Sequence, residues 1–194
     1  MERKEKPIRM VTPVGEAKWA HIHTPKAPFE GKGGPKYMID VLFDVTDAVW
    51  KKWAKDLQDK IRLLPEQVNK KTGEVVARQQ SIKKELDNND QPTGRYYVTF
   101  KTSDKFKPGV FDIHGQLITP EILVGNGSKV KVAYTENVYE AFGGGINLYL
   151  NAVQVIELVE YQNKTAQAYG FEVEEQVSAF DIAGVDKDGE VLPF

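Results

Sequence analysis

The sequence predicts a mainly β protein: a small, closed, five-stranded Greek-key barrel of the OB type, with one helix between its early strands and a flexible acidic C-terminal tail. Three observations support this. Short runs of alternating apolar and polar residues recur from residue 8 to about residue 161, only one stretch has a helical period, and the charge divides the chain into two unlike halves. A β-sandwich is the alternative arrangement of the same strands.

Composition sets limits on the class of protein. The 194 residues are 41% hydrophobic, which is enough for one good core. The chain has no cysteine, so disulfides, thiolate nucleophiles and cysteine-ligated zinc are excluded. No apolar run is long enough to span a membrane, and the charged start, Met1–Pro7, lacks the apolar segment of a signal peptide. We expect a soluble protein of the cytoplasm.

The distribution of charge divides the chain. Residues 1–110 contain 22 Lys and Arg against 15 Asp and Glu, whereas residues 111–194 contain 4 against 13. A basic half followed by an acidic half indicates an anionic ligand and an acidic tail. We expect an arm over 1–7, a folded domain over 8–161 with an insertion at 65–94, and a tail over 162–194.

One long strand or two are predicted over Ile8–Val14 and Ala17–Thr24, with Pro13 and Gly15 marking a bend or bulge between them. Simple alternation puts Ala17, Trp19 and His21 on one face of the second strand. The glycine- and proline-rich segment 25–36 is a loop. Residues 37–44 alternate again and predict a half-buried strand, with Tyr37 and Phe43 on one side.

A helix is predicted from a cap at Thr46 or Asp47 to about Leu64, because apolar residues recur there every three or four positions. Trp50 and Trp53 lie on its apolar stripe and are expected in the core. The polar segment 65–94 that follows contains turn residues, and we expect at most a short hairpin or helix within it.

Three later segments alternate and predict strands: 95–102, 128–135 and 146–158. The first of these places Arg95, Tyr97 and Lys101 on one face, opposite an apolar face. A basic, aromatic turn, Lys105–Gly109, lies between the strands, and three consecutive glycines, 143–145, indicate a bulge or a tight bend before the last strand.

Two sets of residues raise the question of catalysis or metal binding. His21 and His23 have the spacing of a metal pair on one strand face, but such pairs are more often simple surface histidines. Asp40, Asp44, Asp112 and Glu121 are the acidic residues that a metal-dependent nuclease would need, although no pattern singles them out. The residues therefore give only weak support to an enzymatic function.

The more frequent pattern is a cation beside an aromatic residue. Single-stranded nucleic acid needs this combination, since cations follow the phosphates and rings stack on bases. For any one pair, the alternative is a core ring beside a solvated lysine. The candidate DNA-binding residues are Lys18, Trp19, Lys26, Phe29, Lys32, Lys36, Tyr37, Arg95, Tyr97, Lys101, Lys105, Phe106, Lys107, Lys131 and Tyr149.

The segments PKAPFEGKGGPKYMIDVLFD, GRYYVTFKTSD and FGGGINLYLNAVQVIELVEY, in this order, resemble the phage-encoded single-stranded DNA-binding proteins. The Enc34-phage-type family, which is related to the T7-type, is the most similar, over about residues 8–161. The resemblance implies an OB-fold that coats single-stranded DNA in phage replication, recombination and repair. It also implies neither catalysis nor a cofactor, and an infected bacterium as the location.

The tail has two expected functions. A tethered polyanion competes with DNA for a cationic surface. Its apolar end, Leu192, Pro193 and Phe194, is similar in character to the acidic tip of bacterial single-stranded DNA-binding proteins, which implies docking of replication or recombination proteins. A disordered, solubilising tail is the alternative, and homodimerisation is left open. A strand-annealing recombination protein and, less favoured, a metal-dependent nuclease are the alternative functions.

Overall fold

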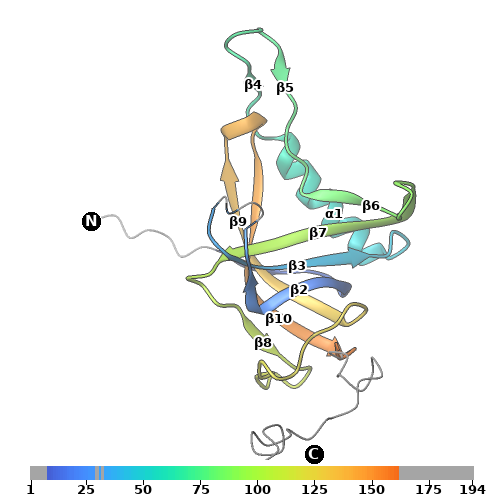
Figure 1. Ribbon diagram of the computed structural model, residues 1–194. Coiled ribbons are helices and arrows are strands. Elements are labelled where there is room, and N and C mark those ends of the chain that lie inside the picture. Colours follow the sequence, from blue (N-terminus) through green and yellow to red (C-terminus); the bar gives the residue numbers. More distant parts are fainter. Residues whose placement is uncertain (1–7, 29–30, 32, 162–194) are drawn as a thin grey trace, which may run out of the picture. The chain divides into compact units, whose positions relative to one another are not determined.

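The computed structural model describes residues 8–28, 31 and 33–161 (Figure 1). The predicted arm over 1–7 and the tail over 162–194 lie outside these residues. The described part contains one α-helix, α1 (Ala48–Arg62), and a short 3-10 helix, η2 (Ala141–Gly143). The strands are β1 (Arg9–Val11), β2 (Gly15–Lys26), β3 (Lys36–Phe43), β4 (Gln67–Val68), β5 (Val75–Val76), β6 (Ile82–Leu86), β7 (Pro92–Ser103), β8 (Gly109–Phe111), β9 (Lys129–Tyr139) and β10 (Gly145–Glu157).

Five of these strands form a closed barrel. β2 pairs with β3, β3 with β7, β7 with β10, β10 with β9, and β9 returns to β2. All the pairs are antiparallel except β7–β10, which is parallel. A meander of three strands and a hairpin of two, joined in this order, make the five-stranded Greek key of the OB-fold. The predicted fold class is therefore confirmed.

The interior of the barrel is filled by the alternating apolar side chains that the sequence analysis placed inward. Ile39, Val98, Phe100, Val130 and Val132 have no measurable exposure. Because successive side chains of a strand point to opposite faces, the residues between them form the outer surface of the barrel. The alternation predicted for residues 37–44 and 95–102 is observed: Tyr37 and Phe43 lie on the buried face of β3, and Tyr97 and Lys101 lie on the outer face of β7.

Register shifts interrupt this alternation in β2 and β10. The β2–β3 register shifts between Lys18 and His21, and the β9–β10 register shifts after Leu150. Trp19 lies at the first shift with a φ of 52°. Ala17 and Ile22 are therefore both buried, although strict alternation would place them on opposite faces. The predicted alternation through β2 is wrong beyond Trp19 for this reason.

Helix α1 begins at the predicted cap, where a side-chain oxygen of Asp47 accepts hydrogen bonds from the backbone N–H groups of Val49 and Trp50. Trp50 is buried and stacks on Phe43 of β3, with ring centroids 4.3 Å apart. The Trp53 indole N–H donates to the Tyr134 hydroxyl at 2.9 Å. Both tryptophans thus attach the helix to the barrel, as predicted. In the described residues, no helix has the length and apolar character needed to cross a membrane.

Segment 65–94 contains more regular structure than the expected short hairpin or helix. The β4–β5 hairpin lies next to η2, at the end of the β9–β10 hairpin (Figure 1). β6, however, is a strand of the main sheet and pairs with β7, which begins at Pro92. The sequence Ile82-Lys-Lys-Glu-Leu86 has no clear alternation, so only its pairing with β7 identifies it as a strand.

The barrel closes at Gly15, which pairs with Val130 of β9 at the start of β2. A Cβ atom at this position would lie 2.7 Å from the carbonyl oxygen of Leu42 and 2.8 Å from the Phe43 ring. No rotamer change can move a backbone oxygen away. The absence of a side chain at Gly15 therefore permits the close approach of β2 to β3.

We predict that Gly15→Ala lowers the free energy of unfolding by roughly 1–3 kcal/mol, the usual cost of overpacking. Denaturant unfolding of the purified variant measures this. Gly34→Ala is the matched control, because nothing lies within 4 Å of the Cβ that it would add. Equal stability of the two variants would contradict a closure that depends on Gly15.

Candidate nucleic-acid interface

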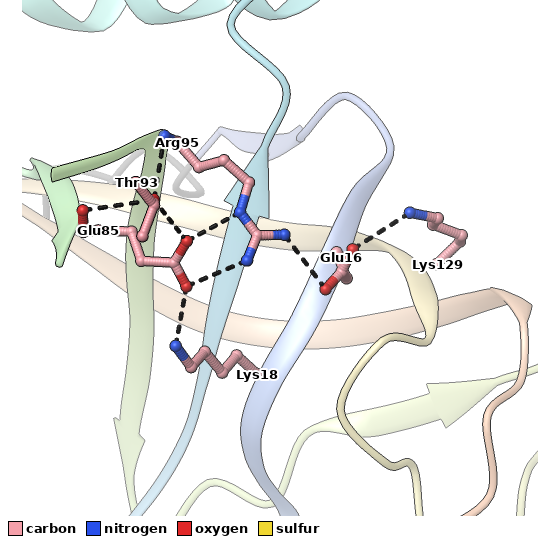
Figure 2. Close-up of polar contacts among 6 residues, drawn as sticks. All are labelled: Glu16, Lys18, Glu85, Thr93, Arg95 and Lys129. Carbon is pink, nitrogen blue, oxygen red and sulfur yellow. Dashed lines mark hydrogen bonds and ion pairs between the residues drawn. The ribbon is translucent and has the colours of Figure 1, made fainter. Parts of the chain in front are cut away.

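A network of ion pairs on the outside of the barrel is organised around Glu85 of β6 (Figure 2). The Glu85 carboxylate accepts hydrogen bonds from Lys18 Nζ at 2.8 Å, Arg95 Nε at 2.8 Å and Thr93 Oγ1 at 2.8 Å. Arg95 also forms an ion pair with Glu16, with an N–O distance of 3.5 Å, and Glu16 forms another with Lys129, at 3.4 Å. The network thus joins β6 and β7 to β2 and β9.

Glu85 is buried, and its surroundings determine its ionisation. Burial by itself would raise its pKa, but the hydrogen bonds from Lys18, Thr93 and Arg95 outweigh this and lower the pKa to about 2. Glu85 is therefore ionised at neutral pH, and its negative charge is balanced within the network.

This arrangement gives two candidate DNA-binding residues a structural role. The charges of Lys18 and Arg95 are opposed by Glu85, and that of Arg95 also by Glu16. Arg95 is therefore less available to a phosphate than its position on the outward face of β7 suggested. A contact of either residue with nucleic acid stays a prediction.

A row of side chains crosses the outer surface of the barrel at Lys101. Strand pairing aligns Lys101 with Met38 and His21 on one side and with Tyr149 on the other. Four residues along β7, beyond Thr99 on the same face, Tyr97 is aligned with Lys83 of β6, whose Nζ lies 5.8 Å from the centre of the Tyr97 ring. We call Lys36, Lys83, Tyr97, Lys101 and Tyr149 the β7 face.

Two of the lysines of the β7 face, Lys36 and Lys83, lie close enough to Lys101 to affect its ionisation. Partial burial lowers the pKa of Lys101, and the positive charges of Lys36 and Lys83 lower it further. In the described part of the chain, none of these three lysines forms an ion pair with a carboxylate. The lysines of the β7 face therefore have no ion-pair partner in the described residues, and Asp40, which lies between Tyr97 and Lys101 on the same face, accepts a hydrogen bond from Thr99 instead. An anion placed near Lys101 would relieve the repulsion among the lysines.

A groove of about 800 Å³ adjoins the β7 face at Tyr149. Phe106, which is 70% exposed, and Phe111 contribute further rings, while Arg9 and Lys107 contribute positive charges. We call this the Phe106 groove. Its combination of rings and cations is the one that single-stranded nucleic acid requires.

The other candidate residues are distributed as follows. Tyr37 is only 7% exposed and packs in the core, so its ring is not presented for stacking, contrary to the prediction. Trp19 and Lys26 line a pocket beside β2, Lys105 is exposed in the turn after β7, and Lys131 lies on β9. Outside the described residues lie Phe29, Lys32, Leu192, Pro193 and Phe194.

The sequence analysis missed three residues that the structure adds: Lys83, Arg9 and Phe111. Lys83 belongs to the segment that was taken as an insertion. Arg9 and Phe111 come from short strands at the edges of the sheet, and only the pairing of these strands with β9 and β10 brings them to the groove. Among them, only Arg9 had a sequence signal, as a cation within a predicted strand.

Among the residues considered for metal chemistry, His23 and Glu121 lie close enough for their charges to interact, but in the described residues no third one joins them. Asp40 accepts a hydrogen bond from Thr99, Asp44 from Thr46, and Asp112 from the backbone of a turn. In residues 8–28, 31 and 33–161, no three His, Asp or Glu side chains form a group that could hold a metal ion. Burial lowers the pKa of both His21 and His23, assisted by Lys26 and Lys107 respectively.

We predict that Glu85→Gln lowers the free energy of unfolding at pH 7 by about 3 kcal/mol, because it breaks a buried, charge-assisted network. The folded-state pKa is depressed, so the stabilisation by Glu85 is complete above the unfolded pKa of about 4.5 and is lost as the pH falls toward about 2. The difference in the free energy of unfolding between variant and wild type, measured at several pH values, should therefore shrink toward zero in acid. Glu74→Gln, at an exposed turn, is the control; a constant difference down to pH 2 would contradict this role of the Glu85 charge.

Comparisons with known proteins identify solved structures that have a similar fold. No protein-family model and no curated protein matches the sequence. Among solved structures, gp2.5, a single-stranded DNA-binding protein encoded by bacteriophage T7, is similar with a TM-score of 0.58 and 19% identity, over 90% of this chain and 99% of that one. The single-stranded DNA-binding protein from bacteriophage Enc34, in complex with single-stranded DNA, is similar with a TM-score of 0.57 and 20% identity, over 77% of this chain and 86% of that one. The chain therefore has the fold of phage single-stranded DNA-binding proteins.

Proposed function

We propose that the protein binds single-stranded DNA without sequence specificity and coats it during phage DNA replication, recombination and repair, in the cytoplasm of the infected bacterium. It does so by binding rather than by catalysis. The strand crosses the β7 face and continues into the Phe106 groove.

One observation carries this proposal: the β7 face combines three lysines without carboxylate partners in the described chain with two outward-facing tyrosines. Phosphates relieve the repulsion around Lys101, and the rings of Tyr97 and Tyr149 offer surfaces on which bases stack. Stacking on rings and contact with phosphates do not depend on base identity, so the expected binding is non-specific.

The solved structures support the same proposal. The two phage proteins described above are single-stranded DNA-binding proteins by name, and one of them was solved with its ligand. Because sequence identity is about 20%, this support concerns the fold, whereas the choice of ligand rests on the side chains of the β7 face.

We predict that the protein binds oligo-dT more tightly than a duplex of equal length, with an affinity that falls as salt increases. Each phosphate contact contributes about 0.7 to the logarithmic salt slope for a single strand. Fluorescence titration at several salt concentrations measures both quantities. Equal affinity for the two DNAs, or an affinity that does not depend on salt, would refute the proposed function.

In the same titration, Lys101→Ala should weaken binding and reduce the slope by about 0.7, while stability is retained because its neighbours are like charges. Lys52→Ala, which removes an exposed lysine from α1, is the matched control and should leave the slope unchanged. An identical salt slope for both variants would show that Lys101 does not contact a phosphate of the DNA.

We further propose that the acidic C-terminal segment competes with DNA for the β7 face, and that Leu192, Pro193 and Phe194 dock replication or recombination proteins. The sequence supports this, since residues 157–194 contain 9 acidic residues against 2 lysines. A tethered anion has a high effective concentration at a cationic surface, and salt weakens its effect.

Deleting residues 181–194 should therefore tighten binding to oligo-dT at low salt, and the gain should shrink as salt increases. A full-length variant distinguishes the effect of the negative charges from that of the length of the segment. It carries Asp181→Asn, Asp186→Asn, Asp188→Asn and Glu190→Gln, and it should bind oligo-dT as tightly as the deletion does. If both proteins bind like the wild type, the segment does not compete.

A further inference from the structure

A second concave site lies on the other side of the β7 face, beside the bulge in β2. It has a volume of about 500 Å³. Its walls are the β2 residues from Trp19 to Thr24, Lys26, the segment 123–126, and Tyr161. We call it the Trp19 pocket; it shares no residue with the Phe106 groove.

Two exposed aromatic rings border the pocket, and at each of these residues a hydrogen bond holds the main chain. Trp19 is 57% exposed and has a φ of 52°, a conformation that is costly for a residue with a bulky side chain. Its N–H donates to Asn126 Oδ1 at 2.9 Å, across the pocket wall. Tyr161 is 58% exposed, and its N–H donates to the Leu123 carbonyl at 2.9 Å. The bulge therefore turns a large apolar side chain toward solvent instead of the core.

The lining of the pocket suits a flat, uncharged ring attached to an anion. Ala20, Ile22 and Val124 provide apolar surface, and Lys26 provides a positive charge, while the described lining contains no Asp or Glu. His23 also lines the pocket, and its buried Nε2 has no hydrogen-bond partner in the described part of the chain. A buried polar atom without a hydrogen bond lowers stability, and a ligand that supplies a hydrogen-bond donor or acceptor to His23 would remove this penalty.

The position of the pocket connects it to the β7 face. His21, in its wall, is aligned through Met38 with Lys101, so the pocket begins where the row across β7 ends. A strand that follows the row toward β2 therefore reaches the pocket. At that point it meets two rings and a lysine but no carboxylate of the described lining.

We infer that the Trp19 pocket accepts one unstacked base of the bound strand, with Trp19 as the stacking surface and Lys26 near the neighbouring phosphate. This inference rests on the proposed function and adds a defined base-binding site to it. Stacking of one base on an aromatic side chain changes affinity by about fivefold or more.

Photo-crosslinking of the full-length protein to a bromodeoxyuridine-substituted oligo-dT tests the inference. Cleavage after Lys18 and Lys26 releases a peptide of residues 19–26, and we expect a crosslink on it at Trp19, with a second at Tyr161. Trp19→Gly should lose the first crosslink and bind oligo-dT about fivefold more weakly. It should remain at least as stable as the wild type, because glycine accepts a positive φ and the Asn126 bond uses only the backbone.

Phe142→Gly is the matched control. Phe142 is also an exposed ring with a positive φ, but it lies at η2 and does not line the pocket. This variant should keep the crosslink on residues 19–26. Crosslinks at Tyr97 or Tyr149 alone would overturn the Trp19 pocket and leave the proposed function intact, whereas a wild type that does not bind oligo-dT would overturn both.

Discussion

The closure of β2 onto β9 at Gly15 is the constraint on which the rest of the structure depends. At this point β2 pairs with β3 along one edge and with β9 along the other, and only a residue without a side chain fits between the Leu42 carbonyl and the Phe43 ring. Closure turns an open sheet into a barrel and gives it two surfaces. Apolar residues fill the interior, and where the strands are regular the intervening side chains form the outer surface.

The positive charge of the outer surface is divided between two tasks. Lys18 and Arg95 surround the buried Glu85 and hold β6 against the barrel, while Lys83 and Lys101 have no acidic partner in the described residues. A count of cations in the basic half of the chain cannot separate these groups. The separation depends on two carboxylates, since Glu85 and Glu16 determine which of the neighbouring cations are neutralised and which remain available to phosphates.

The two concave sites on either side of the β7 face both depend on irregular backbone. In β10, the shift after Leu150 lies beside Tyr149 and the Phe106 groove; in β2, the bulge turns Trp19 outward beside the second pocket. Bulges bend strands and redirect side chains, and they are frequent at functional sites of barrels. The path across the β7 face therefore has aromatic side chains of the protein at both of its ends.

The sequence by itself determined the fold class, the helix with a cap at Thr46 or Asp47, and the alternation of the regular strands, because alternation and helical periodicity are local properties of the chain. It also predicted an outer face of β7 that combines cations with an aromatic residue, at Arg95, Tyr97 and Lys101. Only the tertiary structure assigned β6 to the sheet, joined Arg95 to Glu85, and turned Trp19 away from the buried face of Ala17. These outcomes depend on pairing between distant segments and on one-residue register shifts, for which the sequence carries no local signal.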